Sequence, residues 1–316
     1  MSVIAQSQPP TEQRHPRAQG IDTLSDDETL AILLDSQIEA ARAVRTALPD
    51  LARGARAVQA ALERGGNLVY AAAGSSGLQA LADGLEIPPT FGIPARRIHI
   101  LRAGGYDNMT VPKEGAEDDR DAASADAAVI GPDDCVLCLA ASGNTIYPNV
   151  ILDIARSRGA TTIGIANNPG TRLLETADIA ILLPTPPEVI AGSTRLGAGT
   201  AQKIALNLMS TLLGIRTGNV MDGLMVNVAT SNRKLRGRAA EIVQMLSGCD
   251  ADTARRSLEA AGWKVKEAVL IARGAEGPHE AAAALEQAGQ NLRLALEIRE
   301  QDITARNRTG AGKGAA

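Results

Sequence analysis

Short apolar runs alternate with segments of helical periodicity through the middle of the chain. The runs read "NLVYAAAG", "RRIHILRAG", "DCVLCLAAS", "TTIGIAN" and "IAILLPT". Continuous apolar runs are typical of strands that are buried on both faces. Strands that are separated by helices are joined by right-handed crossovers and form a parallel sheet. The pattern therefore predicts a doubly wound α/β domain over about residues 48–218.

The segments on either side of these runs have a different pattern. Two helices separated by Pro49 are indicated before the first strand, and Ser25 with Glu28 has the spacing of a capping box. After the last strand, apolar positions at helical spacing indicate several short helices joined by turns. The predicted organisation is an extended arm over 1–20, N-terminal helices over 21–66, a sheet domain over 67–237, a helical module over 238–302 and a disordered tail over 303–316.

The amino-acid composition argues against some classes of binding partner. The net charge is −4 and aromatic residues make up 2% of 316 residues, so we expect no nucleic acid partner. No apolar run approaches the roughly 20 residues that span a bilayer, and the N-terminus lacks the pattern of a secretion signal. We expect no membrane association and a cytoplasmic location. Cys135 and Cys138 fall three apart in a predicted buried strand, where they point to opposite faces, so we expect core packing and no metal.

Two predicted strands end in turns rich in small hydroxyl residues. The first turn is Gly74-Ser75-Ser76-Gly77 and the second is Ser142-Gly143-Asn144-Thr145. Ligands of open parallel sheets bind at the carboxyl ends of the strands, and a helix N-terminus attracts an anion. The competing interpretation is that these residues only make tight turns and helix caps. Neither turn has the Gly-Lys-Ser/Thr of a nucleotide-binding loop, so a sugar phosphate is favoured and a nucleotide cofactor is not.

Two acidic residues are candidates for acid–base chemistry. Glu86 stands alone among apolar residues in "LADGLEIPPTFG", directly before two prolines. Desolvation raises the pKa of a carboxyl group, so Glu86 is a candidate general acid held by the prolines. Glu117 lies in the acid-rich stretch "EGAEDDRD", where the acids also have the simpler explanation of stabilising a helix N-terminus.

A third set of polar residues lies in a loop of small residues that leads into a predicted long helix. Its members are Glu188, Ser193, Arg195 and Lys203. Arg195 and Lys203 can complete an anion site, while a contact at a subunit interface is the alternative, and both interpretations can hold together.

Several stretches resemble one family when taken in order. "GNLVYAAAGSSG", "EIPPTFG", "EGAEDDR", "LAASGNTIY", "NNPGT" and "EVIAGSTRLGAGTAQK" follow one another as in the N-acetylmuramic acid 6-phosphate etherases. The chain is also similar to the wider group of SIS (sugar isomerase) domains that includes the glucokinase regulatory protein. The resemblance covers about 11–302. It implies a five-stranded SIS sheet, a C-terminal module like a ubiquitin-associated domain, a homodimer with sites near its interface, and no cofactor.

The resemblance also implies an activity and a set of site residues. The family cleaves the D-lactyl ether of its substrate to N-acetylglucosamine 6-phosphate and D-lactate, in cell-wall recycling. Its catalytic pair falls on Glu86, as the acid for the lactate oxygen, and Glu117, as the base, although the division of roles stays open. The implied substrate-binding residues are Ser75, Ser76, Gly77, Ser142, Asn144, Thr145, Glu188, Ser193, Arg195 and Lys203.

The chain departs from the family at several positions. Leu78 and Asn144 stand where arginine is usual, Gly197 stands for a lysine, and His15 stands for an asparagine in the arm. The first three changes remove positive charge near the expected anion site. Two alternatives therefore stay open, a related isomerase or lyase that acts on another sugar phosphate and a non-catalytic sugar-phosphate regulator. The presence of both glutamates argues against the regulator, which needs no acid–base pair.

Overall fold

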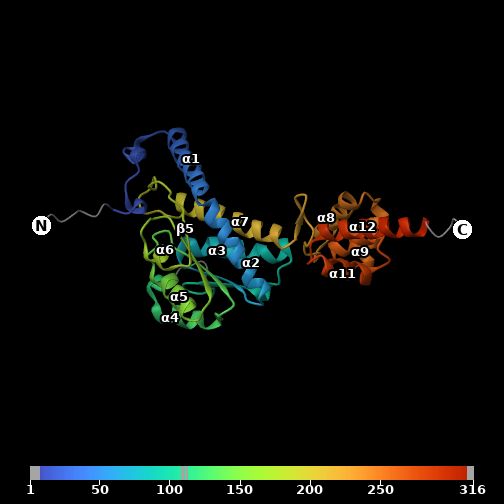
Figure 1. The fold of residues 1–316 in the computed structure, drawn as a ribbon. Helices are drawn as coiled ribbons and strands as arrows, with labels where there is room; N and C mark the ends of the chain where they lie inside the picture. The colour runs from blue at the N-terminus through green and yellow to red at the C-terminus, as the bar shows by residue number, and fades with distance from the viewer. Residues whose placement is uncertain (1–7, 108–110, 112, 312–316) are drawn as a thin grey trace. The chain divides into compact units, whose positions relative to one another are not determined.

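The chain folds into two compact units, traced in Figure 1. This computed structural model describes residues 8–107, 111 and 113–311. The first unit takes in the described residues up to Leu85 together with Pro94–Leu213, and the second takes in Glu86–Ile93 and the described residues from Gly214 onward. The sheet lies in the first unit, and the second unit is mainly helical.

A five-stranded parallel sheet forms the centre of the first unit, in the order β2-β1-β3-β4-β5. The strands are β1 (Leu68–Ala72), β2 (Ile98–Arg102), β3 (Cys135–Leu139), β4 (Thr161–Ala166) and β5 (Ile179–Leu182). Each predicted apolar run contains one of these strands, so the predicted fold class is confirmed. The strand order reverses between β1 and β3, and ligands of such sheets bind at this switch point.

Helices cover both faces of this sheet. They are α2 (Leu48–Glu63), α3 (Gly74–Phe91), α4 (Arg120–Asp126), α5 (Ile146–Ser157), α6 (Arg172–Thr176) and α7 (Gly197–Arg216), and α1 (Asp26–Ala43) precedes them in the chain. The Ser25–Glu28 capping box begins α1 as predicted. Helix α5 packs over β1, β3 and β4 on one face. On the other face, a Cβ at Gly54 of α2 would approach Met209 Sδ to 2.7 Å, so glycine lets α2 pack closely against α7.

The cysteine pair of β3 belongs to the core. Cys135 and Cys138 are both fully buried. Burial raises the pKa of Cys135 to about 12 and also raises the pKa of Cys138, so both remain protonated thiols at neutral pH. The predicted core role of the pair is confirmed. Within the described residues, no group of three or more His, Cys, Asp or Glu side chains could hold a metal ion.

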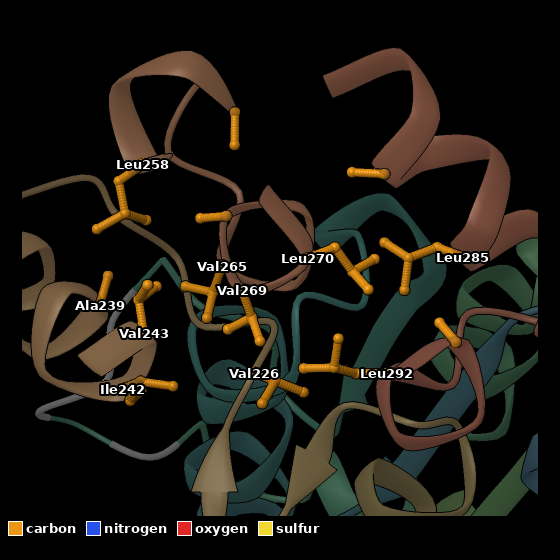
Figure 2. Packing of buried hydrophobic residues seen from close by; sticks show 14 of the residues in the cluster. Val226, Ala239, Ile242, Val243, Leu258, Val265, Val269, Leu270, Leu285 and Leu292 are labelled. Carbon is orange, nitrogen blue, oxygen red and sulfur yellow. The ribbon is translucent and has the colours of Figure 1, made fainter. Parts of the chain in front are cut away.

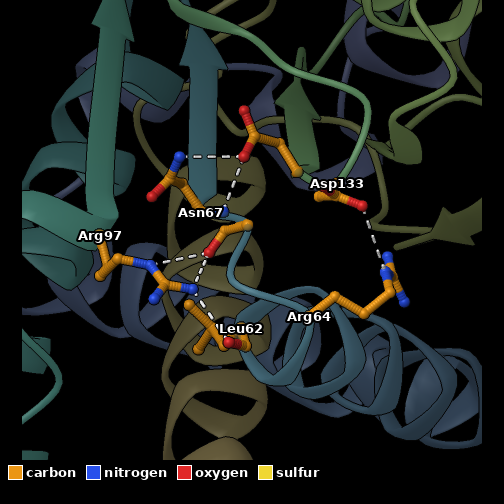
Figure 3. A network of polar contacts seen from close by, with 7 residues as sticks. Leu62, Arg64, Asn67, Arg97 and Asp133 are labelled. Carbon is orange, nitrogen blue, oxygen red and sulfur yellow. Dashed lines mark hydrogen bonds and ion pairs between the residues drawn. The ribbon is translucent and has the colours of Figure 1, made fainter.

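A set of paired polar groups fixes the amino edge of the sheet, where β1 and β3 begin (Figure 3). The carboxylate of Asp134 accepts from the backbone N–H and the side-chain amide of Asn67, at 2.7 and 3.0 Å. Arg97 Nε donates to Gly66 O at 2.8 Å, and its Nη2 donates to Leu62 O at 2.9 Å. These bonds tie the end of α2 to the starts of β1 and β2.

The second unit has a compact aliphatic core, part of which is shown in Figure 2. Its elements are the short strands β6 (Val220–Met221) and β7 (Leu224–Met225) and the helices α8 (Arg233–Ser247), α9 (Ala251–Ala260), α10 (Val265–Ala272), α11 (Pro278–Gln287) and α12 (Leu292–Ala311). Helix α12 runs to Ala311, past residue 302 at which the helical module was expected to end. None of the helices in the described part of the chain is long and apolar enough to cross a membrane.

Candidate active site

Two adjoining cavities lie at the carboxyl edge of the sheet in the first unit. Cavity A has a volume of about 480 Å³ and cavity B of about 440 Å³. Cavity A is lined by Glu12, Ala73, Gly74, Ser75, Ser76, Glu117, Asp118, Leu139, Ala140, Ala141, Ser142, Asn144, Thr145, Gly192 and Thr194. Cavity B shares Ala73, Gly74, Ser75 and Glu117 with cavity A and adds Leu78, Arg102, Ala103, Lys113, Glu114, Gly115 and Ala116.

The first hydroxyl-rich turn forms the start of α3. Gly74 has a φ of 52°, a conformation that favours glycine, and it lets the chain turn sharply from β1 into the helix. Ser75 and Ser76 therefore fall in the first helical turn, where backbone N–H groups have no partner within the helix. The helix dipole adds positive potential at the same place. The turn has the N–H groups and the helix start that the predicted anion site requires.

The second hydroxyl-rich turn links β3 to α5. Ser142 Oγ and Thr145 Oγ1 are 3.1 Å apart, and the backbone N–H of Asn144 donates to Ser142 Oγ at 3.2 Å. Gly143 has a φ of 73°, and a Cβ there would approach Thr171 Oγ1 to 2.2 Å. The turn thus depends on glycine and presents hydroxyl and N–H groups at the wall of cavity A.

The N-terminal arm reaches the same cavity. Its short 3-10 turns include Pro10–Glu12, so the arm is less extended than the sequence suggested. The buried side chain of Asn168, after β4, accepts from the backbone N–H of Thr11 at 3.2 Å and donates to Thr11 Oγ1 at 2.9 Å. The neighbouring Glu12 consequently lines cavity A. At His15, Nδ1 accepts from the N–H of Arg17, which is the kind of cap an asparagine would supply.

The two predicted catalytic glutamates differ in position. Glu117 lines both cavities. Glu86 lines neither of them and is exposed on α3. An α-helix rises about 1.5 Å per residue, so Glu86 lies roughly 18 Å along α3 from Gly74. The two prolines that follow it are inside the last turn of α3 rather than after its end. Glu117 therefore belongs to the walls of the cavities, and Glu86 does not.

Other predicted binding residues also lie outside the walls of both cavities. Glu188 is buried, and its two carboxylate oxygens accept from the N–H groups of Gly197 and Ala198, each at 2.9 Å, which caps α7. Ser193, Arg195, Lys203 and Gly77 line neither cavity either. Lys203 instead contacts Asn207 along α7.

The basic side chains of cavity B, Arg102 and Lys113, were not among the residues predicted from the sequence. Arg102 is the last residue of β2, and its side chain is 8% exposed. The available signal was its position: it is a charged residue at the carboxyl end of a predicted strand, next to the strand that precedes the first hydroxyl-rich turn. Lys113 and Glu12 lie in stretches whose sequence pattern indicated no role.

Comparison with known proteins identifies the family. Residues 109–212 match the model of the SIS domain. The chain is 46% identical over 288 residues to a Deinococcus radiodurans protein named N-acetylmuramic acid 6-phosphate etherase, a match that covers 90% of this chain and 94% of that one. Proteins of the same name from Symbiobacterium thermophilum and Rubrobacter xylanophilus are 43% and 38% identical over 82% and 90% of this chain, and over 87% and 95% of their own lengths. The chain belongs to the N-acetylmuramic acid 6-phosphate etherase family.

Proposed function

We propose that this protein is a carbon–oxygen lyase that converts N-acetylmuramic acid 6-phosphate to N-acetylglucosamine 6-phosphate and D-lactate. The observation that supports this most directly is the composition of cavity A, which combines both hydroxyl-rich turns with the carboxyl group of Glu117. The turns suit a phosphate monoester, and Glu117 can move a proton on the sugar attached to it. The names of the related proteins favour this substrate over other sugar phosphates.

The chemistry needs only acid–base groups. When the sugar ring opens, the C1 aldehyde makes the C2 proton acidic, and a carboxylate removes it. A carboxylic acid protonates the ether oxygen at C3, the C3–O bond breaks, and D-lactate leaves. Water then adds to the unsaturated aldehyde at C3, with its proton returned to C2. Glu117 is assigned the base at C2 because it lies in the wall of cavity A.

The second carboxyl group is assigned to Glu86 of another copy of this chain. Glu86 is exposed and lines neither cavity, so a second copy of the chain is the proposed user of its carboxyl group. A symmetric dimer in which α3 of each chain faces the cavity of the other would supply the missing acid to both sites. Burial in that interface would also provide the desolvation that a general acid needs and that the single chain does not provide.

The test is D-lactate release from N-acetylmuramic acid 6-phosphate in water enriched in heavy oxygen. We expect stoichiometric lactate, with the heavy atom in the C3 hydroxyl group of the sugar product. Lactate that itself contains the heavy atom would indicate direct attack of water on the lactyl carbon, and would rule out elimination. If no lactate forms at all, the proposed activity is wrong.

A further inference from the structure

A buried arginine with unused hydrogen-bonding capacity lies in the wall of cavity B. The side chain of Arg102 is 8% exposed, and its Nη1 donates to Gly105 O at 2.7 Å. Its Nε is buried without a hydrogen-bond partner. No carboxylate among the described residues forms an ion pair with it. A buried cation is costly unless an anion compensates its charge, so the arrangement calls for an anionic ligand.

Arg102 also supplies a positive charge to the cavity in which the family's usual arginine is absent. Leu78 lines cavity B and stands where the family's first turn usually has arginine. Arg102 enters the same cavity from the adjacent strand, and its stem crosses α3 at Gly77, where a Cβ would lie 3.2 Å from Arg102 Cγ. Gly77, expected to bind phosphate, thus makes room for Arg102 instead. The exposed side chain of Lys113 adds a second positive charge to this wall, and its Nζ lies 3.9 Å from a carboxylate oxygen of Asp119.

The two cavities match a substrate with two different anionic groups. The described walls of cavity A contain hydroxyl groups and acidic side chains but no arginine or lysine, whereas those of cavity B contain Arg102 and Lys113 beside two glutamates. Glu117 lies in the wall that they share. In N-acetylmuramic acid 6-phosphate the lactyl group is attached to C3, one of the two reacting carbons, and the phosphate is attached to C6, so C3 lies between the two anionic groups. A substrate that spans both cavities would therefore place its reacting carbons beside Glu117.

We propose that cavity B binds the lactyl carboxylate of the substrate, with Arg102 as its main partner and Lys113 as its secondary one. This inference rests on the proposed function and names the group that distinguishes the substrate from its sugar product. A carboxylate held by a guanidinium forms a charge-assisted pair that an ammonium group reproduces poorly. Arg102 is thus a specificity residue for the lactyl group, and the hydroxyl-rich turns of cavity A hold the phosphate.

The test compares the affinity for two ligands that differ in the lactyl group. Calorimetry would measure the Kd of N-acetylmuramic acid 6-phosphate and of N-acetylglucosamine 6-phosphate with the Glu117→Gln chain, in which turnover should be roughly 10²- to 10⁴-fold slower. Adding Arg102→Gln should weaken binding of the first ligand by roughly 10- to 100-fold, the usual effect of losing a charge-assisted hydrogen bond. Binding of the second ligand should stay almost the same. Lys113→Gln should give the same pattern with a smaller loss.

Two further variants separate recognition from folding. Leu78→Arg added to Arg102→Gln returns a guanidinium to cavity B and should recover most of the lost discrimination, which a role in packing alone would not allow. Arg96→Gln removes an exposed arginine just before the start of β2 and should leave both affinities unchanged. Thermal unfolding of each variant would show that the fold is kept.

The outcomes are distinct. Equal weakening for both ligands would mean that Arg102 binds the phosphate, and no weakening for either would mean that it binds no ligand, so each result overturns the proposal. If the wild-type chain releases no lactate but prefers the lactyl ligand through Arg102, the lyase activity is refuted and the carboxylate site stands. If neither ligand binds, both proposals are wrong.

Discussion

The buried polar side chains at the two edges of the central sheet differ in whether they have hydrogen-bond partners. At the amino edge, where β1 and β3 begin, Asp134 accepts from three N–H groups at 2.7–3.0 Å. At the carboxyl edge, buried polar atoms remain without a partner, and the described ones are Arg102 Nε, Asn149 Oδ1, Thr171 Oγ1 and Gln202 Oε1. Each of these four residues ends a strand or lies near the start of the helix that follows one, from β2 to β5 in turn.

We infer that the polar groups of the amino edge stabilise the fold, whereas those of the carboxyl edge serve binding and catalysis. A buried polar group without a partner costs free energy, and of these four residues only Arg102 lines one of the two cavities, where a ligand can satisfy it. Substitutions at the carboxyl edge should therefore change catalysis and binding with little change in folding. Substitutions at the amino edge should do the reverse.

The largest effect is expected at Glu117. Glu117→Gln keeps the shape of the side chain but removes the proton acceptor, so kcat for lactate release should fall by roughly 10²- to 10⁴-fold. Thermal unfolding should remain close to that of the wild type because Glu117 is exposed. The matched control is Asp121→Asn, which removes one exposed acid in the first turn of α4 and should leave kcat unchanged. If both variants lose activity equally, the effect comes from net charge and not from proton transfer.

A second prediction tests whether the carboxyl edge is complete within one chain. Glu86→Gln and Glu117→Gln chains should each be nearly inactive alone. Co-expressed at equal amounts, they should regain roughly a quarter of wild-type activity, because half of the random dimers are mixed and each mixed dimer holds one intact site. Pairing Glu117→Gln with the double variant should restore nothing. Mixed dimers that stay inactive would show that Glu86 does not act across an interface.

Asp134 tests the amino edge, where a substitution is expected to change stability and not activity. Asp134→Ala leaves the partly buried N–H groups of Asn67 and Gly131 without an acceptor, which should lower the free energy of unfolding by about 2 kcal/mol. Below the new melting temperature, KM and kcat should be nearly normal. Asp133→Asn is the control, because its contact with Arg64 is 3.9 Å long and exposed on both sides and is worth little. A change in KM for Asp134→Ala in the folded protein would contradict the separation of the two edges.

Local sequence signals predicted the fold and the two turns that line cavity A. The five apolar runs, the capping box at Ser25 and the two hydroxyl-rich turns all depend on residues close together in the chain. The function of Glu188 could not be read in this way, because its capping of α7 depends on how a loop folds back onto the helix. Arg102 was missed for a related reason, since only the pairing of β1 with β2 brings it beside α3.

The smallest effect, at Ser142, tests how cavity A holds phosphate. Ser142→Ala removes a hydroxyl group that also interacts with Thr145 Oγ1 and accepts from the N–H of Asn144. We expect KM to rise about tenfold, the value of one hydrogen bond to a charged group, while kcat changes less because the phosphate is remote from C2 and C3. Ser157→Ala, at the exposed far end of α5, should change neither constant. A fall in kcat at constant KM would place the reacting carbons, and not the phosphate, beside Ser142, and would reverse the assignment of the two cavities.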